Sequence, residues 1–529
     1  MSSLNLNETS VAKPREASGI PVGDRDLTLE DVRSLLGDAE RVSLSAESLD
    51  RVRRSAEHLA NLARDRVIYG VNTGFGPMAS CRIAPEDFSA LQTNLIRSHA
   101  LGAGAPLPDA CVKATLIARL RCLVRGHSGV APELVSLFAE MINRDILPVV
   151  PEHGGVGASG DLVQLAHVAL AAIGEGEVRH QGRVRPTAEV FAENGIEPAP
   201  LRIREGLAMV NGTSAMTGIG LVTLLGARAL FHWTLLAAAL IQEILETYDD
   251  PFSPALSGLK AHPGQRRIAG RMTAILSDSR LIHRNGTASL PQNGGGSRDV
   301  QPSYSIRCIP QILGPILETL DCAEKIVVGE LNSVSDNPAI DPDSGELLHG
   351  GNFHGDYVAH EMDKVKAAIT KLSMLCERQL NHLLDDRLNG RLPPFVNLGR
   401  PGLDLGLQGA QFTATSTVAE NQSLAMPVCV HSIPCNRDNQ DIVSMGANAA
   451  LLAKRVVDNS FQVLAIELVA LLQAVDALEV QDRLATETRT LHRELREIVP
   501  VFREDTLTAA DLRRLVDHLQ VPRADHLTR

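Results

Sequence analysis

The chain has 529 residues, 44% of them hydrophobic, and its mean hydropathy is zero. This length and composition predict a soluble globular protein with more than one domain. The net charge of -12 excludes a basic footprint for nucleic acid or an acidic membrane. Aromatic residues make up only 3%, so the core must be built from Ala, Leu, Val and Ile, which favours packed helices.

Two features of the chain bear on its compartment. The eight cysteines show no CxxC pair and no zinc spacing, which indicates reduced thiols in a cytoplasmic protein. Residues 1–25 contain no apolar stretch typical of a secretory signal, and we expect them to form a mobile segment. The strongest membrane candidate, 220–246, is interrupted by polar and charged residues, so a buried core helix is expected there.

Apolar residues recur at helical spacing along most of the chain. The first predicted helices cover 45–64 and 112–128. Much longer ones follow, at 216–247, 309–331, 356–385 and 449–479. The pattern predicts a mainly α protein with an N-terminal domain over 26–215 and a long-helix bundle over 216–529.

Glycine-rich segments interrupt these helices and carry polar side chains, which is where binding chemistry is usually found. They lie at 67–80, 154–160, 289–303, 348–355 and 397–411. The stretch QNGGGSRDV within 289–303 has the composition of a lid, and equally that of a surface loop.

The segment GGVGASG, residues 154–160, holds four glycines, one alanine and one serine. Because Gly160 has no side chain, its amide nitrogen is able to attack the carbonyl of Ala158. Loss of two waters would then leave an electrophilic imidazolone with a methylidene group at Ser159. Taken alone, these residues favour a simpler interpretation, in which Ser159 caps a helix that contains Asp161 in its first turn.

GGVGASGDLVQLAH nevertheless resembles the signature of the histidine, phenylalanine and tyrosine ammonia-lyases and their 2,3-aminomutase relatives. Eight further segments resemble family motifs in the expected order, several of them closest to bacterial tyrosine aminomutases: YGVNTGFG (69–76), LQTNLIRSHALGAG (91–104), EGLAMVNGTSAMTG (205–218), PSYSIRCIPQILGP (302–315), ELNSVSDNPAI (330–340), GGNFHG (350–355), GAQFTATSTVAEN (409–421) and DNQDIVSMG (438–446). The resemblance implies the ammonia-lyase fold, with the active site in the glycine-rich loops. It also implies a 4-methylideneimidazole-5-one group formed from Ala158, Ser159 and Gly160, and a homotetramer in which three chains build each site.

Two positions depart from the family pattern. Gln164 stands where proline is common, and Gly155 stands where serine is common. Neither lies in the cyclising triad, so they affect the expected geometry of the following helix and leave the expected cofactor unchanged. That helix would direct its positive N-terminal end at the ring and stabilise electron density there.

The resemblance also implies roles for individual residues. Tyr69 would be the base that removes the β-hydrogen; since a phenol is largely protonated at neutral pH, its neighbours must favour the phenolate. Arg307 would bind the substrate carboxylate through its guanidinium fork. The remaining residues would contact the substrate, its amine or the ring: Asn211, Tyr304, Phe353 and Gln440.

Three positions bear on the substrate. A histidine at position 99 occurs in enzymes that act on tyrosine or histidine. Gln440 replaces the glutamate typical of histidine-specific enzymes, and Phe412 replaces a tyrosine found in a tyrosine aminomutase. We therefore expect an aromatic L-amino acid that resembles tyrosine first, phenylalanine second and histidine third.

The outcome after elimination stays open from the sequence, because Pro77 replaces a glutamate that the mutases often carry in a loop governing product retention. The alternatives are a histidine ammonia-lyase and a non-catalytic helical scaffold. A scaffold has no need to retain the triad together with Tyr69 and Arg307. A pyridoxal-phosphate or metal-dependent lyase is disfavoured, because the sequence offers no convincing Schiff-base lysine or ligand cluster, and we predict no metal.

Overall fold

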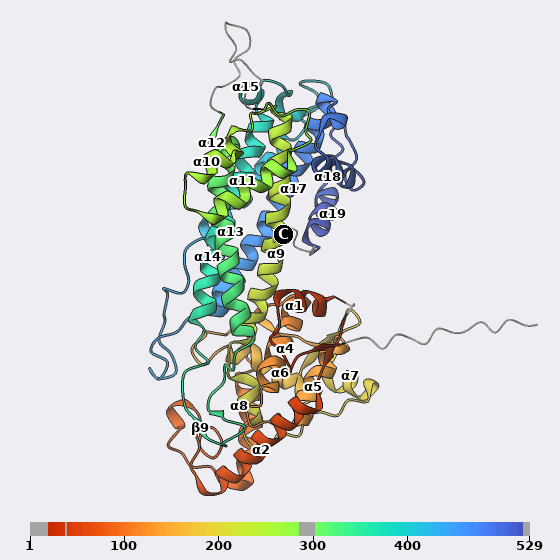
Figure 1. The fold of residues 1–529 in the computed structure, drawn as a ribbon. Coiled ribbons are helices and arrows are strands. Elements are labelled where there is room, and N and C mark those ends of the chain that lie inside the picture. The colour runs from red at the N-terminus through yellow and green to blue at the C-terminus, as the bar shows by residue number, and fades with distance from the viewer. Residues whose placement is uncertain (1–18, 38–39, 285–301, 522–529) are drawn as a thin grey trace, which may run out of the picture.

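The computed structural model describes residues 19–37, 40–284 and 302–521. Within them the chain forms an elongated molecule with two parts, an N-terminal part of short helices and small sheets and a bundle of long helices (Figure 1). The stretch QNGGGSRDV lies outside the described residues, as do residues 1–18 of the expected mobile segment. Residues Ile20 and Pro21, also in that expected segment, instead form strand β1, and the next residue, Val22, is buried.

The N-terminal part is built from helices that pack around small sheets. Its helices are α1 (Leu29–Leu36), α2 (Ala46–Asp65), α3 (Phe88–His99), α4 (Asp109–Val124), α5 (Pro132–Asn143), α6 (Leu162–Ala172), α7 (Thr187–Asn194) and α8 (Glu205–Val210), with the 3-10 turns η1 (Gly76–Met78) and η2 (Pro85–Asp87). Its strand pairings are β1 with β2 (Val42–Ser43), β3 (Ala103–Pro106) with β5 (Pro151–His153), and β4 (Leu147–Pro148) with β6 (Glu177–His180) and β7 (Arg183–Pro186).

Four long helices form the body of the second part: α9 (Ser214–Ile244), α13 (Ile309–Leu331), α14 (Asp356–Leu384) and α17 (Gly446–Leu478). The strands β8 (Ala339–Ile340) and β9 (Leu347–Leu348) connect α13 to α14 and lie against the N-terminal part (Figure 1). Shorter elements surround the bundle: η3 (Asp250–Phe252), α10 (Pro254–Gly258), α11 (Pro263–Ile275), α12 (Tyr304–Arg307), α15 (Asp386–Asn389), η4 (Pro394–Val396), α16 (Gln408–Leu424), η5 (Gln481–Arg483), α18 (Thr486–Arg496) and α19 (Ala509–Gln520).

The predicted mainly α fold and its long helices are confirmed, each within a few residues of its expected ends. The largest difference is in α4, which ends at Val124 although apolar periodicity predicted helix to residue 128. Gly126 has a φ of +77°, a left-handed conformation that a right-handed helix cannot contain.

One continuous hydrophobic core joins the two parts across the predicted domain boundary at 215/216. Helices α4 and α9 meet closely there, since a Cβ on Gly218 would lie 2.5 Å from the backbone nitrogen of Thr115. The division into two domains therefore stays a prediction. What the packing establishes is that α9 begins inside the N-terminal part and carries its core into the bundle.

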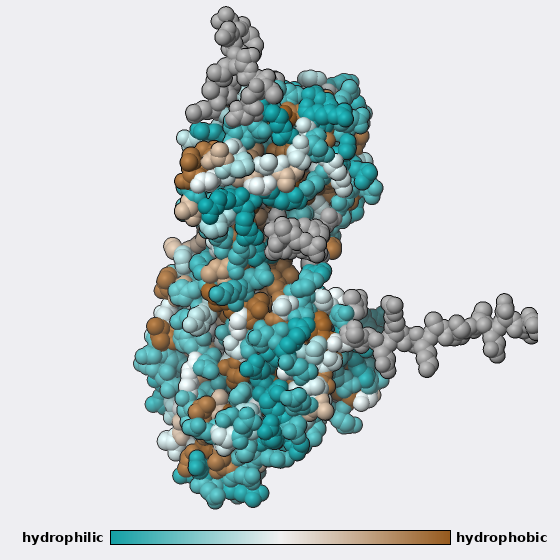
Figure 2. Space-filling view, viewed as in Figure 1, coloured by the Kyte–Doolittle hydropathy of each residue, from teal (hydrophilic) through white to brown (hydrophobic). Residues whose placement is uncertain are grey.

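Helices α9 and α17 are long and apolar enough to cross a membrane by length and composition, including the segment that we expected to fail this test. Their surroundings are those of core helices, because 78% of each apolar window is buried inside the molecule. On the face shown in Figure 2, hydrophobic residues are scattered among hydrophilic ones over the described part of the bundle. Burial, more than composition, thus favours a core role for both helices.

Glu467 lies in α17 with no exposed surface, and burial raises the pKa of its carboxyl to about 8. A raised pKa contributes stability that is complete below the usual value near 4.5 and is lost as pH rises through 8. We therefore expect the free energy of unfolding of Glu467→Gln to equal that of the wild type at pH 5 and to be higher by a few kcal/mol at pH 9. Thermal unfolding at several pH values measures this. A difference in stability between variant and wild type that is the same at all pH values would contradict this prediction. Glu420→Gln, at an exposed position, serves as the control.

Candidate active site

A cavity of about 740 Å³ opens in the N-terminal part beside the glycine-rich loops. Helix α3, the start of α6 and the end of α8 form its walls, together with loop segments 69–79 and 436–440. The residues that line it are Tyr69, Phe75, Gly76, Pro77, Met78, Ala79, Leu91, Asn94, Leu95, Ser98, His99, Ser159, Leu162, Leu207, Asn211, Asn337, His349, Phe353, Asn436, Arg437, Asn439 and Gln440. Its size suits a small organic molecule.

The segment 154–160 forms an irregular loop at this cavity, and α6 begins just after it. The helix N-cap is Asp161 and not Ser159, so the simpler interpretation of Ser159 as a helix cap is wrong. Gly160 has a φ of +74°, and a Cβ there would lie 2.0 Å from the carbonyl oxygen of Gly212. This position therefore accepts only glycine, and the backbone of the triad is pressed against residues 211–212.

Two amide side chains hold Ser159 from different directions. Asn211 donates from Nδ2 to the Ser159 carbonyl oxygen at 3.0 Å, and Gln440 donates from Nε2 to Ser159 Oγ at 3.1 Å. The next residue is fixed as well, since the Asp161 amide donates to the Gly212 carbonyl at 2.8 Å. Ser159 is thus fixed in place while it still lines the cavity.

Tyr69 lies half-buried on the cavity wall, and the Gly76 amide donates to its phenolic oxygen at 2.9 Å. A backbone N–H aimed at this oxygen stabilises negative charge on it. His99, at the end of α3, uses Nδ1 to contact the Leu95 carbonyl at 2.9 Å. Because a carbonyl only accepts, Nδ1 carries the proton, and Nε2 of the neutral ring is a hydrogen-bond acceptor.

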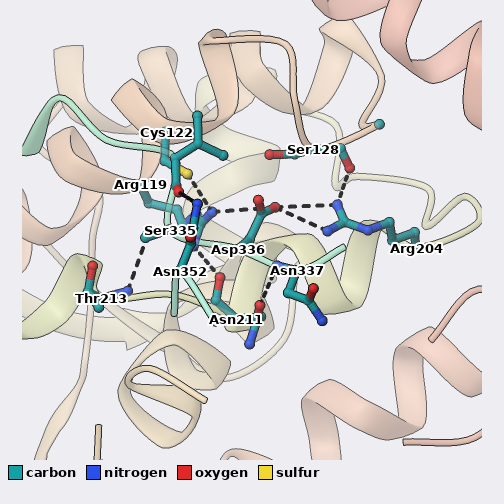
Figure 3. A network of polar contacts seen from close by, with 12 residues as sticks. Arg119, Cys122, Ser128, Arg204, Asn211, Thr213, Ser335, Asp336, Asn337 and Asn352 are labelled. Atoms are coloured by element: carbon teal, nitrogen blue, oxygen red, sulfur yellow. Dashed lines mark hydrogen bonds and ion pairs between the residues drawn. The ribbon is translucent and has the colours of Figure 1, made fainter. Parts of the chain in front are cut away.

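Behind Asn211 lies a buried polar network that joins three distant parts of the chain (Figure 3). Arg119 donates from Nη1 to the Asn211 carbonyl at 2.7 Å, and the Asn337 amide donates to Asn211 Oδ1 at 2.7 Å. Arg119 and Arg204 flank Asp336, at 3.9 Å and 3.3 Å, and all three side chains have no exposed surface.

One carboxylate between two guanidiniums leaves an excess of positive charge in this cluster. A buried excess charge is costly in free energy. The cluster lies behind Asn211, one of the two residues that hold Ser159, and Arg119 is its contact with Asn211.

Asp161 is fully buried beneath the triad, and burial raises the pKa of its carboxyl to about 7. Its Oδ2 accepts from the Met216 amide at 2.7 Å, in the first turn of α9. Helices α6 and α9 therefore both begin near the triad. The positive ends of their dipoles lie there, which agrees with the direction expected for the helix that follows the triad.

The two departures from the family pattern occupy adjoining space. A Cβ at Gly155 would lie 2.4 Å from Oε1 of Gln164, whose Nε2 donates to the Glu152 carbonyl at 3.0 Å. Glutamine in α6 thus fills the room that a side chain at position 155 would need. Helix α6 remains regular from Leu162 to Ala172, so neither departure disturbs it.

The structure brings most of the expected site residues to one cavity: Tyr69, Ser159, His99, Asn211, Phe353 and Gln440. Ala158 and Gly160 flank Ser159. Tyr304, Arg307 and Phe412 do not line this cavity. Tyr304 and Phe412 are 71% and 66% exposed, and α12, which carries Tyr304 and Arg307, lies at the other end of the bundle from α6 (Figure 1).

Several residues of the site were not expected. Arg119, Arg204 and Asp336 lie far apart in the sequence, and only the fold joins them. A weak signal existed for Arg119, which is one of three cationic residues, with Lys113 and Arg121, in the mostly apolar helix α4. Asn337 lies in the family motif ELNSVSDNPAI, but no role was predicted for it. Within the described parts of the chain, no cluster of metal-ligating side chains occurs.

Comparison with known proteins gives a consistent result. The family model for aromatic amino acid lyases matches residues 27–497. The chain is 42% identical to tyrosine 2,3-aminomutase from Myxococcus fulvus over 474 residues, covering 88% of this chain and 90% of that protein. It is 42% identical to tyrosine ammonia-lyase from Cupriavidus metallidurans over 455 residues, covering 84% and 85%.

The crystal structure of tyrosine aminomutase from Streptomyces globisporus superposes with a TM-score of 0.90 at 37% identity, covering 95% of this chain and 97% of that one. Histidine ammonia-lyases also match, as in Geobacillus thermodenitrificans at 40% identity, covering 92% of this chain and 94% of that protein. With its fold, its cavity and these likenesses in agreement, the chain belongs to the aromatic amino acid lyase family.

Proposed function

We propose that this protein eliminates ammonia from an aromatic L-amino acid, with tyrosine-like substrates first, and releases an aryl acrylate. The single observation that carries the proposal is the meeting of Ser159 and Tyr69 in one cavity, with Ser159 held by Asn211 and Gln440. A cyclising triad and a base that line one cavity would act on the same bound substrate, which supports the proposal.

The residues around the triad fit a 4-methylideneimidazole-5-one group. Position 160 accepts no side chain, so its nitrogen is unhindered, and Asn211 holds the carbonyl of Ser159. Once formed, the group supplies an electrophilic carbon that makes the substrate amine a better leaving group. Ala158, Ser159 and Gly160 would form it, and Asn211 would hold it through the Ser159 carbonyl oxygen. Gln440, whose partner Oγ leaves as water, would then be available to the substrate.

Tyr69 is the base of the proposed reaction. Its oxygen accepts a hydrogen bond from the Gly76 amide at 2.9 Å, which holds the phenol at the cavity where the β-proton would be taken. Gly76 is followed by Pro77 in η1, so a change in this loop would move both the donor and the cavity wall.

His99 supports a substrate with a hydroxyl on its ring. Since Nδ1 holds its proton for the Leu95 carbonyl, Nε2 is able to accept a hydrogen bond from a phenol. Phenylalanine would leave this acceptor without a partner, which lowers its rank. Gln440 carries no charge to attract an imidazole, which lowers the rank of histidine.

The substrate carboxylate would be bound by Arg307 of another chain in a homotetramer. Tyr304, beside Arg307, and Phe412 are exposed in the single chain, as expected of residues that complete a neighbour's site. A cytoplasmic location agrees with the eight cysteines, none of which forms a disulfide.

Incubation of the purified protein with tyrosine, phenylalanine and histidine separately tests the proposal. Mass spectrometry of the products should show the acrylate of tyrosine formed fastest. A β-amino acid that accumulates before the acrylate would add the aminomutase reaction. Release of urocanate from histidine alone would contradict the substrate ranking, and no turnover of any of the three would contradict the function.

Arg119 should prove to be a positioning residue for this site. We expect Arg119→Met to lower kcat about tenfold or more, because Asn211 loses the donor behind it, and to destabilise the fold by about 3 kcal/mol. Arg204→Met removes the other guanidinium of the network without touching Asn211 and serves as matched control. Kinetics and thermal unfolding separate the two effects. Equal kcat values in both variants would contradict a positioning role.

A further inference from the structure

A second hollow, of about 270 Å³, lies in the N-terminal part and shares no lining residue with the cavity above. Its walls come from the turn after β1, from α2 and from the C-terminal end of α4. The lining residues are Gly23, Asp24, Arg25, Asp26, Arg51, Arg121, Arg125 and His127. Four arginines against two aspartates form a cationic hollow on a chain whose net charge is -12.

The guanidiniums that line this hollow differ in how many hydrogen bonds and ion pairs they already make within the protein. Arg121 is 1% exposed and is bonded to the Val22 carbonyl at 2.7 Å and to Asp26 at 2.8 Å. Arg25 makes a two-point contact with Asp31, a residue that does not line the hollow. Both side chains are therefore fixed in place, and they contribute positive charge to the wall of the hollow.

Arg51 and Arg125 retain free donors. Arg51 contacts the Gly23 carbonyl at 3.1 Å, and within the described residues it has no carboxylate at ion-pair distance. Arg125 lies 3.7 Å from Asp26, which it shares with Arg121. His127 donates from Nδ1 to the Ile340 carbonyl at 2.9 Å and is not counted among the free donors.

Asp26 is the weak counter-ion of the group, because its side chain is 74% exposed. An exposed carboxylate on a turn can move into water at little cost when a stronger anion takes its place. The like charges also oppose one another: burial, and then the charge of Arg125, lowers the pKa of Arg121.

We propose that this hollow binds the phosphate group of a small phosphate monoester, such as a nucleoside monophosphate. Guanidinium forks bind phosphate oxygens at two points, and two partly free arginines beside a buried third match a dianion better than Asp26 does. The second carboxylate, Asp24, already accepts a hydrogen bond from the Ser45 hydroxyl at 2.6 Å. The volume exceeds that of phosphate alone and leaves room for the group that carries it. This site is independent of the proposed reaction.

Isothermal titration calorimetry on the full chain at low ionic strength tests the proposal, with inorganic phosphate, AMP and adenosine as probes. We expect saturable binding of phosphate and of AMP, with AMP no weaker, and none of adenosine. Arg51→Gln and Arg125→Gln should each weaken binding about tenfold or more. Asp26→Asn should tighten it, because the competing carboxylate is removed.

Arg54→Gln is the matched control, since Arg54 lies on the same helix as Arg51, pairs with Asp343 and does not line the hollow. Its affinity should equal that of the wild type. Failure of phosphate and AMP to bind, binding of adenosine alone, or equal affinity in all variants would overturn the proposal. Unchanged thermal midpoints in the variants would show that they keep the fold.

Discussion

Ser159→Ala should abolish the activity, with kcat lower by a factor of about 10³ or more, since the electrophile supplies most of the driving force for loss of the amine. The physical reason is that the methylidene carbon arises only when the serine hydroxyl leaves as water. Alanine has no such group. The absorbance band of the modified triad should disappear with the activity, while the fold remains, because Ser159 is held by contacts at the cavity and not in the core.

Ser98→Ala provides the matched control, because Ser98 also lines the cavity and its hydroxyl bonds only locally, to the Leu95 carbonyl and His99. It should keep the absorbance band and most of the activity. A Ser159→Ala protein with the turnover of the wild type would exclude the triad as the catalyst.

Tyr69→Phe should lower kcat by about 10²–10⁴, the range typical of a lost general base, and leave the absorbance band intact. The ring stays on the cavity wall, so substrate binding and KM should change little. Only the oxygen that accepts the Gly76 amide is removed. The decisive result is therefore a modified triad that no longer turns over substrate.

Tyr248→Phe is the control for this change, since Tyr248 packs against His283 away from the cavity. If Tyr69→Phe and Tyr248→Phe had equal kcat values, Tyr69 would not be the base. Loss of the absorbance band in Tyr69→Phe would instead assign Tyr69 to formation of the group.

Much of the fold could be predicted from the apolar residues of the long helices, because α13 buries one regular face and α9 is buried on nearly all sides. The end of α4 was predicted four residues too late, because the prediction followed apolar spacing and not Gly126, whose left-handed backbone ends the helix. The short strands were also not predicted. Two-residue strands such as β1 and β8 carry no periodic signal, and β1 pairs with a strand 22 residues further along the chain.

The candidate site was predictable where one motif holds both the residue and its partner, as for Tyr69 and Gly76. It was not predictable where the partners come from different segments, as for Arg119, Arg204 and Asp336. The contact between Gly155 and Gln164 was only partly predictable. Each departure was visible in the sequence, but their contact required the loop and α6 to be placed together.

The mass of the intact purified protein tests the central claim most directly. If residues 158–160 condense as proposed, the wild-type chain will be lighter than its sequence mass by two water molecules, and Ser159→Ala will not show this loss. A wild-type protein at its full sequence mass would mean that no such group forms, and the proposed reaction would have no electrophile.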